Sequence, residues 1–365
     1  MQRFIFIIAT SFIIIGIISC AKQNEFLDQR YSMSDVVPTT IDELQGLLDN
    51  DAIMNNNAPA LALAGTDNFN VSDIDILTLD VWERNAYMWK KDIFEGSSLS
   101  EWGPLYTIVR NANIVLEGLE KLGLPTSNIG GYNRVKGSAL FYRALAFYHL
   151  AQTFAQPYST DASNKLGIPL RTSSDVNIKL ERATLQQTYD KILSDLNLAE
   201  TLLPATTDYI TRPSKATVYA LQAKVFLQMN DFVKAGESAS KCLNIKNTLL
   251  DFNSISDGSF PFRNYSRSNP EYLFYMLNVS FSVFNSFSRG LVDSNFYKTY
   301  EAADIRKKLF FRVTVGTPNI IHFKGSYSVG IQFGGLAVNE VYLILAESLV
   351  RQNKLTEGLA ALNTL

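Results

Sequence analysis

The sequence predicts a mainly α-helical protein, a scaffold of tetratricopeptide-like helical hairpins that carries a loop-rich, mixed insertion. Apolar side chains recur at three- and four-residue steps over long stretches, the spacing that places them on one face of a helix. Small and aromatic residues also follow one another at that spacing around short polar turns, which approximates the tetratricopeptide pattern. With 365 residues, the chain can bury a sizeable core in one large domain or two closely packed ones.

The first residues are typical of an export signal. Arg3 leads an apolar run over residues 4–19, which ends in Ile-Ile-Ser before Cys20. The run is short for a membrane span, which needs about 20 apolar residues. Ile-Ile-Ser-Cys resembles the bacterial lipobox, whose cysteine becomes the first mature residue and carries acyl chains. We therefore predict a lipoprotein signal peptide at residues 1–19, lipidation of Cys20 and a lipidated tether at residues 20–36. An ordinary secretory peptide with an incidental cysteine is the alternative.

Composition excludes several classes of function. A net charge of -2 argues against nucleic acid and against a polybasic grip on anionic lipid, because both need clustered Lys and Arg. If Cys20 is lipidated, Cys242 has no disulfide partner, and its apolar helical surroundings predict a buried thiol. Only two histidines, His149 and His322, are available for metals or catalytic triads. We predict a protein that is not an enzyme, with no catalytic residue, no cofactor and no metal site.

The first ordered helix is expected after the tether. Over residues 38–48, Leu44, Leu47 and Leu48 recur at helical spacing behind an acidic pair that suits the positive end of a helix. Residues 51–100 have weaker periodicity, and clusters of Asn, Gly, Asp and Ser divide them into loops and short elements. This irregular region nevertheless holds two of the three tryptophans, and loops with large aromatic side chains often bind something.

Three long helices are predicted next. Apolar faces run through residues 102–116, 140–151 and 184–203, and small alanines in the second allow close helix packing. The third ends at Pro204, which cannot continue a helix. A polar connection at residues 158–182 separates the second from the third. It is longer than helical bundles usually tolerate, which makes it a candidate functional loop.

Two helical hairpins are predicted in the second half of the chain. Residues 216–244 contain the clearer one, and residues 341–365 repeat it more loosely. The intervening residues 250–335 are rich in Phe, Tyr, Ser, Asn and Gly, with an alternation that favours strands and loops over helices. A regular solenoid is therefore excluded. We predict an N-terminal helical region over residues 37–215 and a hairpin region over residues 216–365 that contains this insertion.

Several motifs follow one another along the predicted helices and loops, among them Trp102-x-x-Leu105-Tyr106, Gly137-x-Ala139-x-Phe141-x-Arg143-Ala144, Gly167-Ile168-Pro169-Leu170-Arg171 and Asn339-Glu340-x-Tyr342-Leu343. In this order they resemble the SusD/RagB family of nutrient-uptake outer-membrane lipoproteins. The family pattern continues beyond residues 362–363, so the resemblance implies a chain that is short at its C-terminus, by nature or as a fragment. It also implies that the helical scaffold is SusD-like.

The resemblance further implies a function and a location. Members of this family capture an oligosaccharide, such as starch, or in some relatives a peptide, and hand it to a SusC-like TonB-dependent transporter. By this resemblance the protein is a surface-exposed binding lipoprotein on the outer membrane, held by its lipid anchor and facing the cell exterior. Its expected partners are the SusC-like transporter and the ligand, with no nucleic acid.

A capture protein needs aromatic faces for the C–H surfaces of sugars, and Asn, Asp or Arg for their hydroxyl groups. The irregular region supplies both kinds, and residues 265–296 hold similar ones. We predict that the ligand-binding residues are Asp67, Asn68, Trp82, Tyr87 and Trp89. The alternating Tyr87 and Trp89 equally fit one face of a short strand.

Other conspicuous residues are assigned to structure. Trp102 and Tyr106 lie at helical spacing on an apolar face and are expected in the core. Arg143 among apolar neighbours is expected to form a structural ion pair or to cap a carbonyl. The pattern Asp73-x-Asp75 lacks the glycine and glutamate of a calcium loop, which favours a solvated turn.

Two other classes of protein stay open at this point. A lipoprotein adaptor could use its tetratricopeptide-like hairpins to bind partner proteins without a small-molecule site. An anchored glycoside hydrolase would need two carboxylates facing each other about 5 to 9.5 Å apart, and no spacing in this sequence selects such a pair. The long insertion favours ligand capture over the adaptor.

Overall fold

The computed structural model describes residues 38–365 except residues 97–100, 266, 282–289 and 329–330. The chain divides into two units at Thr40, and every helix and strand named below lies in the second, Ile41–Leu365. The predicted signal peptide at residues 1–19, the predicted lipidation site Cys20 and the tether at residues 20–36 lie outside the described residues.

Helices dominate the second unit, which confirms the predicted fold class. The α-helices are α2 (Ile41–Leu48), α3 (Asp51–Met54), α4 (Leu61–Ala64), α5 (Asp73–Ile76), α6 (Val81–Tyr87), α7 (Trp102–Leu122), α8 (Ile129–Phe154), α9 (Leu185–Leu202), α10 (Lys215–Gln228), α11 (Phe232–Ile245), α13 (Ser294–Thr299), α14 (Ile305–Phe310), α15 (Val338–Arg351) and α16 (Leu355–Leu362). The strands form antiparallel pairs, β1 (Phe69–Asn70) with β3 (Leu291–Val292), β2 (Tyr272–Phe274) with β6 (Leu336–Ala337), and β4 (Phe311–Thr314) with β5 (Thr317–Phe323).

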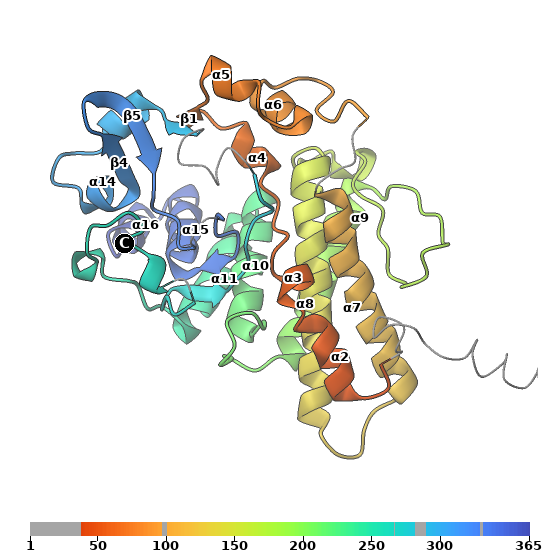
Figure 1. The fold of residues 1–365 in the computed structure, drawn as a ribbon. Helices are drawn as coiled ribbons and strands as arrows, with labels where there is room; N and C mark the ends of the chain where they lie inside the picture. Colours follow the sequence, from red (N-terminus) through yellow and green to blue (C-terminus); the bar gives the residue numbers. More distant parts are fainter. Residues whose placement is uncertain (1–37, 97–100, 266, 282–289, 329–330) are drawn as a thin grey trace, which may run out of the picture. The chain divides into compact units, whose positions relative to one another are not determined.

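The long helices pack one against the next. Helix α8 lies between α7 and α9, and α10 and α11 continue the series (Figure 1). Most side chains of α8 are buried, as expected for a helix with neighbours on several sides. Two starts are fixed by capping boxes, because Thr184 and Gln187 cap α9, and Ser214 and Thr217 cap α10.

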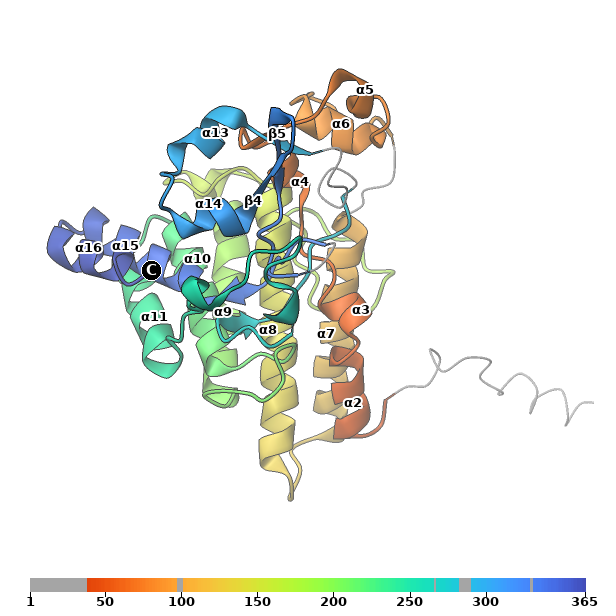
Figure 2. The ribbon, with the colours of Figure 1, turned by 60° about the vertical axis from the view of Figure 1, so that its left-hand side comes forward.

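The two predicted hairpins are α10 with α11 and α15 with α16. They are separated by the insertion in the sequence, yet α15 packs directly on α11. Figure 2, turned by 60° from Figure 1, also shows α11, α15 and α16 together. The insertion therefore interrupts the helical series in the sequence, but the helices on its two sides still pack against each other.

The insertion forms short elements with small apolar clusters of their own, as its composition predicts. One cluster centres on Phe262, Tyr272 and Tyr327, and another on Phe311 and Ile321. The pairing of β2 with β6 fastens the insertion to the start of α15.

Helices α4, α5 and α6 form a lobe, defined here as residues 58–96, beside the upper end of the long helices in Figure 1. Strand β1 of this lobe pairs with β3 of the insertion. The alternative of a short strand carrying Tyr87 and Trp89 is wrong. Tyr87 is the last residue of α6, and Trp89 lies in the following turn with a left-handed φ of 53°.

Candidate ligand-binding site

Trp89 is the most exposed tryptophan of the lobe, with 77% of its surface accessible. Its indole lies beside Gly65, where ring atoms come within 3.5 Å of the position that a Cβ would take. The indole Nε1 donates a hydrogen bond to the carbonyl oxygen of Gly65 at 3.1 Å. The lobe thus presents an aromatic surface that is held at one point and open to solvent.

Asp67 and Asn68 follow Gly65 in the same loop, and both are exposed. The carbonyl oxygen of Asn68 accepts a hydrogen bond from the backbone N–H of Asp293 at 2.9 Å, beside the pairing of β1 with β3. The loop backbone is therefore fastened to the insertion. Its exposed carboxylate and amide are of the kinds that bind sugar hydroxyl groups.

Unlike Asp67, Asn68 and Trp89, the side chains of Trp82 and Tyr87 are half-buried. Trp82 meets Phe281 edge to face, with ring centroids 4.5 Å apart. The Tyr87 hydroxyl accepts a hydrogen bond from the backbone N–H of Val71 at 3.1 Å. Of the five predicted site residues, Trp82 joins the lobe to the insertion and Tyr87 braces the lobe from within. The other three, Asp67, Asn68 and Trp89, lie at its surface.

Glu101, directly before α7, fastens the lobe to that helix, a role that its sequence context does not predict. The carboxylate Oε1 accepts hydrogen bonds from the backbone N–H groups of Ala60 and Leu61, each at 2.7 Å, at the start of α4. The side chain is 2% exposed, and this burial raises the pKa of its carboxyl group to about 7. No local pattern distinguishes Glu101 from a surface glutamate, because its partners lie some 40 residues earlier.

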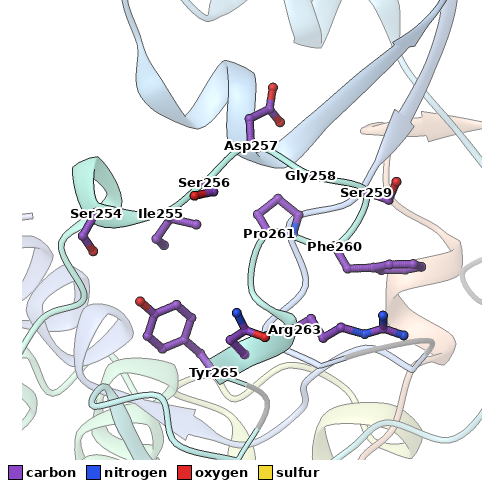
Figure 3. A pocket seen from close by; sticks show the side chains of 11 residues that line it. Ser254, Ile255, Ser256, Asp257, Gly258, Ser259, Phe260, Pro261, Arg263 and Tyr265 are labelled. Atoms are coloured by element: carbon purple, nitrogen blue, oxygen red, sulfur yellow. The ribbon is translucent and has the colours of Figure 1, made fainter.

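A hollow of about 380 Å³ lies in the insertion and is lined by a single loop, residues 254–265 (Figure 3). A short 3-10 helix carries Arg263 and Tyr265, and Figure 3 shows Tyr265 below Ile255 and Arg263 extending beneath Phe260. The Arg263 guanidinium lies 5.5 Å from the centre of the Phe260 ring. The loop belongs to the aromatic-rich insertion at residues 250–335, but the part of it considered for ligand binding begins at residue 265.

Arg143 forms the structural ion pair that the sequence predicts. Its Nε and Nη2 donate to the two carboxylate oxygens of Asp195, each at 2.8 Å, and its Nη1 donates to Asn113 Oδ1. Arg143 is 6% exposed and Asp195 is 3% exposed. The pair joins α8 to α9 within the core.

His149 is half-buried, and Cys242 lies in the core. Burial lowers the pKa of His149 to about 3 and raises the pKa of the Cys242 thiol to about 12. Cys242 is fully buried, as its apolar helical pattern predicts. Trp102 and Tyr106 are partly buried against the core. Within the described residues, no group of three His, Cys, Asp or Glu side chains is placed to hold a metal ion.

Comparison with solved structures defines the class of fold. A crystal structure of a SusD superfamily protein from Bacteroides thetaiotaomicron matches with a TM-score of 0.75 at 19% identity, over 89% of this chain and 79% of that one. A SusD-like carbohydrate binding protein from Bacteroides vulgatus matches with a TM-score of 0.66 at 18% identity, over 90% and 75%. At these identities the likeness establishes the fold, a SusD-like helical scaffold.

Sequence comparison then establishes the family. The model of a SusD-like family, described as "Starch-binding associating with outer membrane", matches residues 25–227, more than half of the 365 residues. The chain belongs to this SusD-like family. SusD-like protein P2 of Formosa agariphila is 31% identical over 144 residues, a stretch covering 39% of this chain but only 26% of that protein. The family is thus one of starch-binding proteins associated with the outer membrane. No described helix is long and apolar enough to cross a membrane.

Proposed function

We propose that this protein is a surface lipoprotein that captures an oligosaccharide and delivers it to a SusC-like TonB-dependent transporter. Membership of a family described by starch binding and by association with the outer membrane supports this proposal. Within the chain, the supporting observation is Trp89, a large aromatic side chain that is 77% exposed yet held in place by a hydrogen bond.

The local geometry suits a saccharide. An indole offers a broad, rigid apolar surface, so stacking a sugar ring on it costs little conformational entropy. Asp67 can accept hydrogen bonds from hydroxyl groups, and the Asn68 amide can both donate and accept. Three further residues would support binding indirectly, because they hold the lobe in the shape that presents these groups: Trp82, Tyr87 and Glu101.

Replacing Trp89 by Ala is expected to weaken saccharide binding at least tenfold, because an exposed stacking surface is lost. Isothermal calorimetry with starch-derived malto-oligosaccharides measures the affinity, and the melting temperature without ligand should stay near that of the parent protein. Met88→Ala, an adjacent exposed position at 52% accessibility, is the matched control and should bind normally.

Equal affinity in Trp89→Ala and the parent protein would contradict this site. If the protein captures a ligand, that ligand should raise the melting temperature of the intact protein, whereas the adaptor alternative expects no rise with any saccharide or peptide. If only peptides raise it, the protein has a ligand site but its ligand is a peptide.

The anchor is tested separately. Cys20→Ala is expected to move the protein from the membrane fraction to the soluble fraction, because acyl chains on Cys20 would provide the membrane affinity. Cys242→Ala should stay in the membrane fraction, since that thiol is buried in the folded domain. A Cys20→Ala protein that remains in membranes would disprove lipid anchoring at this residue.

The transporter partner is tested by a pull-down of the anchored protein, which should bring down a large barrel protein.

A further inference from the structure

An open hollow of about 580 Å³ lies where α8 ends and the long connection between α8 and α9 begins. Phe154 and Leu166 give it apolar surface, and Lys165 and Arg182 contribute two positive charges. The connection singled out in the sequence as a candidate functional loop thus supplies both cations. The 3-10 helix η2 (Ala162–Asn164) immediately precedes Lys165.

Both cations are positioned by neutral oxygen atoms. The Lys165 ammonium donates to the Ser159 hydroxyl at 3.0 Å. Arg182 Nε donates to the carbonyl oxygen of Gly167 at 2.6 Å, and Nη2 donates to that of Phe154 at 3.0 Å. These contacts fix the direction of both side chains while leaving their charge without a counterion.

Carboxylates are close in sequence but do not neutralise this pair. Within the described part of the chain, neither Lys165 nor Arg182 has a carboxylate oxygen within the 4.0 Å of an ion pair. Asp161 accepts a hydrogen bond from the Asn164 amide at 2.6 Å instead, and Glu181 is exposed outside the residues that line the hollow. Arg182 Nη1 makes no hydrogen bond to a described residue, so it is available to a ligand.

The hollow borders the lobe that carries Trp89. The Phe154 ring lies 6.4 Å from the ring of Phe94, which follows α6 in the lobe, and 5.0 Å from that of Trp102. Figures 1 and 2 both show the C-terminal end of α8 beside the lobe. The end of α8 that lines the hollow is therefore packed against the lobe through Phe94.

We propose that this hollow receives an anionic substituent of the captured oligosaccharide, a carboxylate or a sulfate ester, so that the preferred substrates are acidic oligosaccharides. This inference rests on the proposed function for its saccharide backbone. An ammonium beside a guanidinium with unused N–H donors suits a group with several acceptor oxygens. Because both cations are already oriented, little side-chain entropy is lost when the anion binds.

A first experiment tests the hollow without any saccharide. Inorganic sulfate is compared with chloride at equal ionic strength, in the parent protein, Lys165→Gln and Lys307→Gln. Lys307 is the matched control, because its half-buried amine also donates to a neutral oxygen, the carbonyl of Tyr300 at 2.7 Å, but lies in α14. The sulfate-dependent rise in melting temperature should fall by at least half in Lys165→Gln alone. An equal rise in all three proteins would overturn the anion site.

A second experiment uses matched ligands. Oligogalacturonides are compared with their methyl esters, and sulfated carrageenan oligosaccharides with their desulfated forms, which separates a carboxylate from a sulfate. We expect an acidic form to bind at least tenfold tighter than its neutral match. This advantage should fall threefold or more in Lys165→Gln and shrink as salt rises. Acidic and neutral forms of equal affinity would overturn the proposal.

The outcomes separate this inference from the proposed function. If neutral saccharides bind through Trp89 and acidic ones gain nothing, only the anion site fails. If no saccharide binds, both the capture function and the preference for acidic saccharides are disproved. The sulfate experiment then decides whether the hollow binds anions.

Discussion

Replacing Asp195 by Ala is expected to lower the free energy of unfolding by about 3–5 kcal/mol, the cost of leaving a buried charge without its partner. Arg143 donates two hydrogen bonds of 2.8 Å to the Asp195 carboxylate, and its side chain is only 7% exposed. Lys191 also binds this carboxylate, at 2.9 Å, but it is partly exposed and can turn to solvent. The Arg143 guanidinium cannot, so it would keep its hydrogen bond to Asn113 but its buried charge would lose its counterion.

The effect should extend beyond the two helices. Asn113 accepts from Arg143 and donates to the carbonyl oxygens of Arg171 and Ser173 in the long connection. Urea denaturation of the variant measures the loss. Asp190→Ala is the matched control on the same helix, where the exposed carboxylate accepts a hydrogen bond from Gln186, and it should change stability by about 0.5 kcal/mol or less. A loss below about 1 kcal/mol for Asp195→Ala would mean that water reaches Arg143 in the folded protein.

Arg143 also shows how far the sequence could predict this fold. A charge inside an apolar helical stretch indicates a structural pair, but nothing local selects Asp195 among the acidic residues. The helices themselves were predictable, because their apolar spacing is local and their caps, such as Thr184, are local too. The packing of α15 on α11 was not, since the whole insertion separates them in the chain.

The candidate site shows the same difference between local patterns, which the sequence reveals, and distant contacts, which it does not. Composition predicted a lobe rich in aromatic side chains, but Trp82, Tyr87 and Trp89 look equivalent in the sequence. Their roles differ because Trp82 meets Phe281, some 200 residues later, whereas the hydrogen bond of the Trp89 indole goes to the nearby Gly65. Burial is decided by such distant contacts, so aromatic content can point to a site region without saying which rings are free to bind.

Glu101 is expected to make the stability of the folded protein fall as the pH rises from 4.5 through about 7. Burial raises the pKa of its carboxyl group from 4.5 to about 7, so the folded protein binds a proton in this range that the unfolded chain has released. Its favourable contribution is therefore complete below pH 4.5 and lost as the pH rises through 7. The loss is on the order of 3 kcal/mol, at 1.36 kcal/mol for each pKa unit.

Glu101→Gln isolates this contribution, because its amide stays neutral and its carbonyl oxygen can still accept from Ala60 and Leu61. Urea denaturation from pH 4.5 to 8 should show the variant gaining stability relative to the parent protein as the pH rises. Glu120→Gln, an exposed position on the same helix α7, should give a curve parallel to the parent. Parallel curves for Glu101→Gln would mean that water solvates the carboxylate, and that its contact with the start of α4 does not exclude water. Because Gly65 directly follows α4, a looser α4 would also displace the partner of Trp89, so saccharide affinity should decline over the same pH range.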